Sequence, residues 1–249
     1  MTKKNKPDNS PRVYQKPKIK FDLNIRVRPD LTDKQKEILA LIQHKDTKIV
    51  FLRGDAGTSK SFLAIQAGLH LLNDKKVAEM SYIRPTIESA DSHLGFLPGD
   101  IASKISPYEK VLLDKLEELL PAGDIANLYS DDRIKSEVVN YCRGASWAGK
   151  YIVADEAQGY TFNELKTLLT RLSVFSKMVI CADPTQSDLP LNKQGGFERI
   201  ASLFSDEEAK ALGIFSVQLE ECDIVRSELC KFLVSRFKKD HDSKLAERK

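Results

Sequence analysis

The sequence predicts an α/β fold in which a mostly parallel β-sheet carries helices on both faces. Short runs rich in β-branched and aromatic residues alternate with helical stretches along most of the chain, as in parallel sheets whose strands are joined by helices. One such run, residues 48–52, leads into a glycine-containing segment and then into an apolar helical stretch. The 249 residues are enough to bury one sizeable core, so a single main domain is expected.

Composition divides the chain into an arm, a domain and a tail. Residues 1–28 contain three prolines among lysines and few large apolar side chains, so they are predicted to form a flexible basic arm. Such an arm either holds a nucleic-acid backbone through its positive charges or is only a solvated tail. Residues 29–240 are predicted to form one domain, and residues 241–249 a charged C-terminal tail.

The elements of the domain follow one another from residue 32. The first helix is predicted at residues 32–44, where Thr32 is a suitable N-cap and apolar residues recur at helical spacing. A strand at 48–52 and a strongly apolar helix at 62–72 come next. Further strands are predicted at 78–83, 137–141, 151–154, 178–181 and 215–217, with helical stretches between most of them.

Two segments depart from this alternation. Residues 84–106 lack a clear period and contain Pro, Gly and Ser, so they are predicted to form a long loop over the active face of the sheet. Long ordered loops are usually functional. The last helical stretch is predicted at about residues 223–239 and leads into the charged tail.

Cysteine usage and hydropathy exclude several classes of protein. The four cysteines form no C-x-x-C pair and have no nearby His at metal-ligand spacing, so neither a zinc site nor a disulfide framework is indicated. The N-terminus has Lys and Pro where a signal peptide needs an apolar core. No apolar run approaches the roughly 18 residues that span a bilayer. A cytoplasmic protein without a membrane partner is therefore expected.

Residues 54–61 contain what a phosphate-binding loop needs. Such a loop follows a strand, turns backbone N–H groups inward through small residues, and supplies a lysine ammonium and a hydroxyl for magnesium. The candidate nucleotide-binding residues are Gly54, Asp55, Ala56, Gly57, Thr58, Ser59, Lys60 and Ser61. Lys60 is placed for the β- and γ-phosphates, and Ser61 for the metal. The alternative is a glycine-containing turn without a ligand, which the strand before it and the helix after it disfavour.

Ser59 stands where the phosphate-loop pattern has its last Gly. Glycine adopts a positive φ at little cost, whereas serine does not. The Ser59 side chain is therefore expected to affect how tightly and how fast the loop works, rather than where the site lies.

Two acids, Asp155 and Glu156, end the apolar strand 151–154. Nucleotide hydrolysis needs one acid to hold Mg²⁺ and one to orient the attacking water. Asp155 is the candidate metal-side acid, and Glu156 is the candidate general base. Pairs of this kind also occur as solvated turns, but the phosphate-binding loop upstream favours the catalytic interpretation.

A third polar group, Gln186, lies in a proline-bounded loop after the strand 178–181. Ligands of open α/β sheets bind at the carboxyl ends of the strands. From that edge, Gln186 can donate to a γ-phosphate oxygen and accept from the attacking water. The alternative is that Asp183 and Gln186 only cap a turn.

Taken in order, these residues and several further segments resemble the PhoH-like ATPases of bacteria and bacteriophages, relatives of the superfamily 1 helicase motor core. The matching segments are LTDKQKEIL (31–39), RGDAGTSKS (53–61), RP (84–85), LGFLPGD (94–100), PY (107–108), RGASW (143–147), DEAQ (155–158), LTRLS (169–173), SKMVICADPTQSDLP (176–190) and DIVRS (223–227). They cover nearly the whole chain after the arm. The resemblance implies a RecA-like P-loop NTPase fold, with 29–240 as a single P-loop ATPase domain that uses ATP and Mg²⁺.

The resemblance also implies roles for three residues outside the motifs above. Gln35 matches the glutamine that reads the adenine base. Arg171 and Arg226 match arginines that can meet a γ-phosphate, although an arginine in a helix is otherwise a surface residue. Family members assemble as hexameric rings, so a homo-oligomer is implied, in which one of the two acts across a subunit boundary as an arginine finger.

RNA or single-stranded DNA is the polymer partner that the resemblance implies. Arg84, Arg143 and residues 86–106 lie where a strand-binding groove would be. Two other functions stay open. A nucleoside kinase can also pair a phosphate loop with DEAQ, but it carries a cysteine zinc ribbon that is missing here. A nucleotide-binding switch or scaffold with little turnover is the second, and Ser59 favours it.

Overall fold

The computed structural model of the protein describes residues 22–85, 101–139, 146–187, 189, 194–225 and 227–246. Its helices are α1 (Asp33–Gln43), α2 (Lys60–Asn73), α3 (Ile101–Leu119), α4 (Ala122–Ser130), α5 (Phe162–Leu169), α6 (Gly196–Leu203), α7 (Glu207–Ala211) and α8 (Glu228–Ala246). Its strands are β1 (Ile49–Arg53), β2 (Glu79–Arg84), β3 (Ile134–Val138), β4 (Lys150–Ala154), β5 (Lys177–Ala182) and β6 (Ile214–Gln218).

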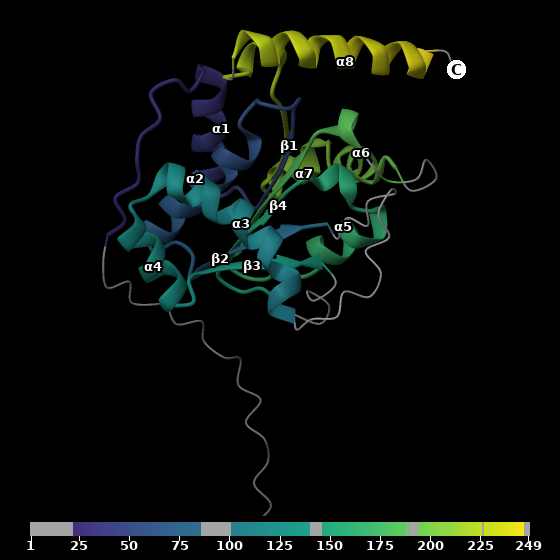
Figure 1. Ribbon diagram of the computed structural model, residues 1–249. Helices are drawn as coiled ribbons and strands as arrows, with labels where there is room; N and C mark the ends of the chain where they lie inside the picture. The colour runs from purple at the N-terminus through teal and green to yellow at the C-terminus, as the bar shows by residue number, and fades with distance from the viewer. Residues whose placement is uncertain are drawn as a thin grey trace, which may run out of the picture.

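The six strands form one parallel sheet in the order β3-β2-β4-β5-β1-β6 (Figure 1). Val50 of β1 lies between Val179 of β5 and Phe215 of β6. Because every strand runs the same way, the residues that follow β1, β4 and β5 meet at one edge of the sheet. The predicted α/β fold with a mostly parallel sheet is confirmed.

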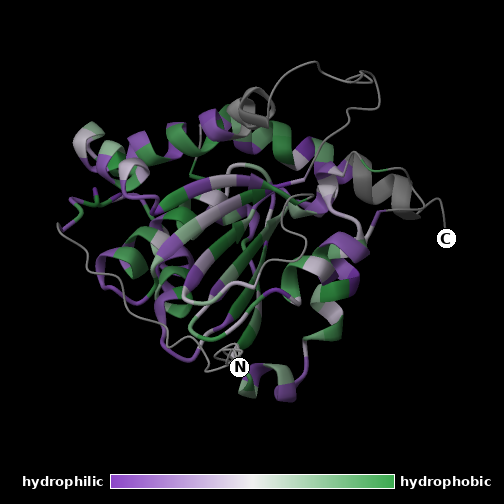
Figure 2. Ribbon diagram, turned by 90° about the horizontal axis from the view of Figure 1, so that it is seen from below, coloured by the Kyte–Doolittle hydropathy of each residue, from purple (hydrophilic) through white to green (hydrophobic). Residues whose placement is uncertain are grey.

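Two hydrophobic clusters hold helices on the two faces of the sheet. Adjacent strand residues alternate between them: Tyr82 belongs to the cluster that contains the apolar residues of α1 to α4, and Ile83 to the cluster of α5 and α6. Side chains of period two point to opposite faces of a strand. Figure 2 shows the sheet with helices on either side of it. Helix α2 has ten buried residues, of which eight belong to one of the two clusters.

Three predicted boundaries are wrong. Strand β3 begins at Ile134 rather than at 137, because this edge strand pairs only with β2 and needs no continuous apolar run. The predicted loop 84–106 is helical from Ile101, and its residues 86–100 lie outside the described part. Helix α8 continues to Ala246, so residues 241–246, predicted as tail, are helical.

Residues 22–28, which the sequence places in the arm, lie along the domain. Leu23 is buried in the core, and its N–H donates to the Asn73 side chain at 2.7 Å. The N–H of Arg26 donates to the Leu119 carbonyl at 2.8 Å. Residues 1–21 lie outside the described part. Among the helices that the structure describes, none combines the length and the apolar character needed to cross a membrane.

Candidate nucleotide-binding site

The loop between β1 and α2 is held by close backbone contacts. A Cβ on Gly54 would lie 2.8 Å from Thr58 Oγ1 and 2.9 Å from Leu219 Cβ, so only glycine fits there without a shift. The Thr58 hydroxyl donates to the Asp55 carbonyl at 2.7 Å. The Asp55 carboxylate accepts from Lys238 of α8 at 2.9 Å, so the loop is also tied to the last helix.

Ser59 is the residue immediately before α2, and its φ is 66°. This is the left-handed region, which costs a residue with a Cβ roughly 1–2 kcal/mol. The Ser59 side chain makes no capping hydrogen bond to the helix, so nothing of that kind offsets the cost. The torsional restriction expected from the sequence is present in the structure.

Lys60 opens α2 and folds back over the loop. Its Nζ donates to the carbonyls of Gly54 at 2.7 Å and Asp55 at 2.9 Å. The ammonium therefore lies above the backbone N–H groups of a helix N-terminus, where the helix dipole also favours an anion. A phosphate placed there would replace these neutral carbonyl acceptors with anionic oxygens, which form an ion pair with the ammonium.

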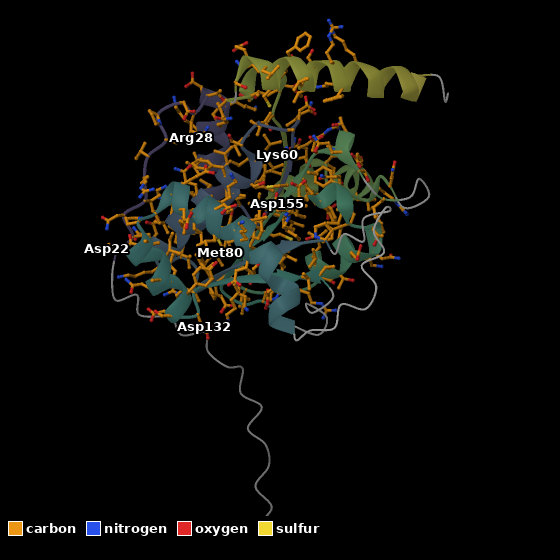
Figure 3. The ribbon with its side chains drawn as sticks, in the orientation of Figure 1. Asp22, Arg28, Lys60, Met80, Asp132 and Asp155 are labelled. Atoms are coloured by element: carbon orange, nitrogen blue, oxygen red, sulfur yellow. The ribbon has the colours of Figure 1, made fainter. Side chains whose placement is uncertain are left out.

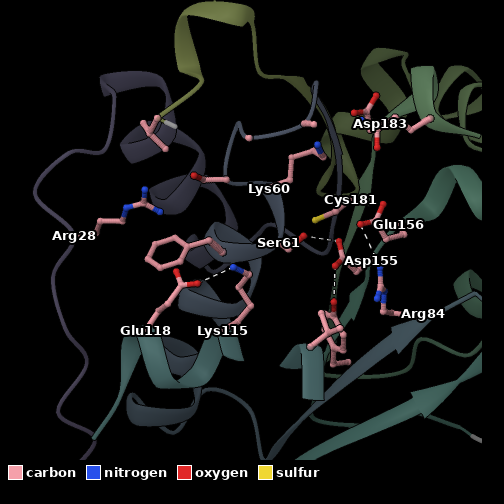
Figure 4. A pocket seen from close by; sticks show the side chains of 18 residues that line it. Arg28, Lys60, Ser61, Arg84, Lys115, Glu118, Asp155, Glu156, Cys181 and Asp183 are labelled. Carbon is pink, nitrogen blue, oxygen red and sulfur yellow. Dashed lines mark hydrogen bonds and ion pairs between the residues drawn. The ribbon is translucent and has the colours of Figure 1, made fainter. Parts of the chain in front are cut away.

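Ser61 and Asp155 come together from α2 and the end of β4. The Ser61 hydroxyl donates to Asp155 Oδ1 at 2.7 Å, and the Tyr82 hydroxyl donates to Asp155 Oδ2 at 2.5 Å (Figure 4). Burial, then the charge and the hydrogen bond of Asp155, raise the pKa of Tyr82 far above its usual range, so Tyr82 stays a donor. Figure 3 shows Lys60 and Asp155 close together in the same part of the domain.

The Ser61 and Asp155 oxygens suit Mg²⁺. This ion prefers oxygen ligands, keeps several waters and is usually held by one or two carboxylates together with substrate phosphates. Among the described residues there is no group of three or more His, Cys, Asp and Glu side chains that could hold a metal ion alone. The donor set therefore fits an ion that arrives with a nucleotide.

Glu156 is held at the mouth of the same site by two side chains. Its φ is 52°, which turns the residue sharply away from the strand. Arg84 Nη2 lies 3.3 Å from Glu156 Oε1, and Gln158 Nε2 donates to Oε2 at 2.7 Å. Gln158 Oε1 in turn accepts from the N–H of Asp183 at 2.9 Å. Gln158 therefore joins the ends of β4 and β5, a role that was not identified from the sequence.

Asp183 and Gln186 follow β5 at the same edge. Asp183 Oδ1 accepts from the N–H and the hydroxyl of Thr185. Asp183 therefore caps the short turn Pro184–Gln186, as expected from the interpretation of this segment as a capped turn. Its Oδ2 is buried and has no hydrogen-bond partner among the residues that the structure describes. Gln186 lines the cavity. Its contact with a γ-phosphate stays a prediction.

Gln35, predicted to read adenine, is fully buried. Its Nε2 donates to the carbonyls of Thr58 at 3.1 Å and Asp223 at 2.9 Å, and its Oε1 accepts from the N–H of Thr32. Both of its amide hydrogens are therefore engaged, and it is not among the residues that line the cavity. In this structure it joins α1 to the phosphate loop, and its role toward adenine stays a prediction.

Of the two candidate arginine fingers, Arg171 and Arg226, the structure describes only Arg171. Arg171 follows α5, where its carbonyl accepts from the N–H of Trp147, and it does not line the cavity. Arg226 lies outside the described residues. Arg143, considered for a polymer groove, also lies outside them.

Many of the predicted site residues line one cavity of about 350 Å³. From the phosphate loop and the strand ends these are Ala56, Gly57, Ser59, Lys60, Ser61, Asp155, Glu156, Asp183 and Gln186. The same cavity is lined by residues that were not identified from the sequence: Arg28, Phe62, Val111, Lys115 and Glu118. Of these, Arg28, Lys115 and Glu118 lie on the side of Ser61 away from Glu156 in Figure 4. The volume is in the range of small-molecule sites.

Comparison with known proteins identifies a family and several relatives of this chain. Residues 26–238 match the family described as PhoH-like protein. The PhoH-like protein of Bacillus subtilis is 32% identical over 97% of this chain and 73% of its own length. That of Synechocystis is 32% identical over 85% of this chain and 62% of its own length. Protein PhoH of Escherichia coli is 31% identical over 82% of this chain and 56% of its own length, so this chain spans little more than half of some relatives.

Proposed function

Because the chain belongs to the PhoH-like family, which is generally ATP-binding and has a RecA-like P-loop fold, we propose that it binds ATP with Mg²⁺ and hydrolyses the β–γ anhydride. One observation carries the proposal. Lys60 and Ser61 of the phosphate loop share a cavity with Asp155 and Glu156 at the end of β4. A site that only binds phosphate needs the first pair, whereas hydrolysis needs both.

Binding starts at the phosphate loop. The phosphates lie across the N-terminus of α2, where backbone N–H groups point at them, and Lys60 turns from the loop carbonyls to their oxygens. Ser61 and Asp155 hold the Mg²⁺, directly or through water. The metal neutralises charge that develops on the phosphates.

Hydrolysis uses the carboxylate of Glu156. It orients a water at the γ-phosphate and accepts its proton. Gln158 and Arg84 fix this carboxylate in position, because each contacts a different oxygen. Gln186 lies on the next strand end and contacts the γ-phosphate or the attacking water.

The hydrolysis is proposed to be coupled to RNA or single-stranded DNA in a homo-oligomer, as a hexameric ring. The positive charge of residues 1–28 supports a polymer partner. Arg84 supports it too, since it lines the cavity just before residues 86–100. Arg171 lies away from the cavity of its own subunit, as expected of a residue that acts on a neighbour's nucleotide, and Arg226 is the other candidate for that role.

A nucleotide-binding switch with little turnover is the second candidate. The left-handed backbone at Ser59 favours it, because strain at the loop opposes the tight closure around phosphates that catalysis needs.

Phosphate release separates the two functions. Phosphate release is measured for the wild type and for Lys60→Ala with ATP and Mg²⁺. Each protein is assayed without a polymer, with single-stranded RNA and with single-stranded DNA. We expect release by the wild type, an increase with one of the polymers, and neither tight binding nor release by Lys60→Ala. ATP binding by the wild type without release under every condition would establish the switch instead.

A further inference from the structure

The cavity is also lined by Arg28, Phe62 and Val111, and Figure 4 shows Arg28 at the end away from Glu156. Phe62 directly follows Ser61 in the first turn of α2. The Arg28 guanidinium lies over its ring, with the central carbon 4.9 Å from the ring centroid. Figure 4 shows Arg28 and the labelled pair Lys115 and Glu118 at this end, on the side of Lys60 away from Glu156.

The direction of a bound nucleotide follows from the phosphate machinery. Lysine and hydroxyl groups of such a loop serve the β- and γ-phosphates. The acids that act on the γ-phosphate, Asp155 and Glu156, lie on the side of Ser61 away from Arg28 (Figure 4). The α-phosphate and the nucleoside must then extend toward the opposite end. That end is the one lined by Arg28 and Phe62.

The planar guanidinium of Arg28 provides a flat surface at this end of the cavity. Its Nε and Nη2 donate to the two carboxylate oxygens of Asp30 at 2.8 and 3.1 Å, and this hydrogen bonding lowers the pKa of Asp30. The guanidinium is thus fixed in orientation while one face packs on Phe62. Planar guanidinium groups stack on aromatic rings and on nucleobases.

We infer that Arg28, supported by Phe62 and Asp30, forms the stacking site for the base of the bound nucleotide. The inference rests on the proposed binding of a nucleoside triphosphate. It gives the base a different partner from Gln35, whose amide is engaged by Thr58 and Asp223.

Recognition at this end is by stacking rather than by the edges of the base. Lys115 and Glu118 line it, but they form an ion pair with each other at 2.7 Å. Every base has a π-face, so stacking tolerates different bases. The site is therefore expected to take purine nucleoside triphosphates with little discrimination, with ATP and GTP binding within roughly threefold of each other.

The test compares two ligands, ATP and inorganic tripolyphosphate, each with Mg²⁺, by calorimetric titration. The proteins are the wild type, Arg28→Ala, Arg28→Lys and a control, Arg26→Ala, which removes an equal charge from the same segment, where Arg26 contacts the Glu117 carbonyl. We expect Arg28→Ala and Arg28→Lys to weaken ATP binding roughly tenfold. Tripolyphosphate binding should change less than about twofold, and Arg26→Ala should match the wild type.

Three results would overturn the inference. An equal loss of affinity for ATP and for tripolyphosphate in Arg28→Ala would show that Arg28 contacts the phosphates. Full retention of ATP affinity in both Arg28 variants would show that the base binds elsewhere. Thermal unfolding of each variant shows whether a loss reflects misfolding, and Arg28→Lys keeps the charge if Arg28→Ala unfolds. Failure of the wild type to bind either ligand would refute the proposed function itself, which the first two results leave standing.

Discussion

Ser59 is the residue where the phosphate loop departs most from an unstrained backbone. Its φ of 66° suits glycine, but glycine also has more conformational freedom to lose on folding. The two effects leave a small advantage to glycine. Ser59→Gly is expected to raise the free energy of unfolding by about 0.5 kcal/mol and to tighten ATP binding.

Chemical denaturation measures this effect, with Ser59→Ala as the control. Alanine keeps a Cβ at the same φ and is expected to bring no gain. If Ser59→Gly proved less stable than Ser59→Ala, the backbone at this position would not be under the strain inferred.

Tyr82 acts on the site through Asp155. Tyr82→Phe removes the hydrogen bond to Asp155 Oδ2 and leaves a buried carboxylate oxygen without it, which is expected to cost about 1–3 kcal/mol of unfolding free energy. Asp155 also loses the group that orients it toward Ser61. The Mg²⁺ dependence of ATP binding should therefore shift to higher Mg²⁺ concentration.

Tyr151→Phe is the matched control, because this buried tyrosine of β4 donates to the Ala64 carbonyl at 2.7 Å and does not line the cavity. It should lower stability without changing the Mg²⁺ dependence. Equal Mg²⁺ dependence in the two variants would show that Tyr82 has only a structural role.

At the scale of elements, Lys177 joins the start of β5 to the end of α1. Its Nζ donates to the carbonyls of Ile42 and His44, which lie at the negative end of the helix dipole. Burial, with smaller effects of Lys48 and Lys76, nevertheless lowers the pKa of Lys177 to about 8.

This depressed pKa predicts a pH dependence of stability. Between about pH 8 and the model-peptide value near 10.4, the unfolded chain binds a proton at Lys177 that the folded chain has lost, so the free energy of unfolding rises with pH. Below pH 8 the lysine is charged in both states and its contribution is constant. The rise should be present in the wild type and smaller in Lys177→Gln, as measured by denaturation from pH 7 to 10.5; parallel curves would contradict it.

Elements also differ in how far the sequence predicts them. Central strands such as β4 and β5 are buried along their whole length, apart from the first residue of β4, and give continuous apolar runs. The edge strand β3 is buried only at its ends. Its middle residues are polar, so the strand has no continuous apolar run by which to predict its start. Helix α3 contains Pro107, and a proline inside a polar stretch is usually read as a break.

For the molecule as a whole, the sequence located the phosphate loop and the acids because each is a short local motif after a strand. Tyr82 and Gln158 were missed as site residues, since their partners Asp155 and Asp183 are 73 and 25 residues away. The stacking of Arg28 on Phe62 depends in the same way on how the N-terminal segment crosses the domain. Local motifs therefore predict the residues that contact the nucleotide, whereas the side chains that orient those residues can be identified only from the fold.

Hydrolysis of ATP at this sheet edge with Glu156 as the base is tested by Glu156→Gln. Single-turnover phosphate release is measured beside ATP affinity, with Glu208→Gln of α7, an exposed glutamate, as the control. We expect the ATP affinity of Glu156→Gln to stay within about threefold of the wild type and its phosphate release to be slowed roughly a hundredfold or more. Release at the wild-type rate in Glu156→Gln would contradict this role of Glu156.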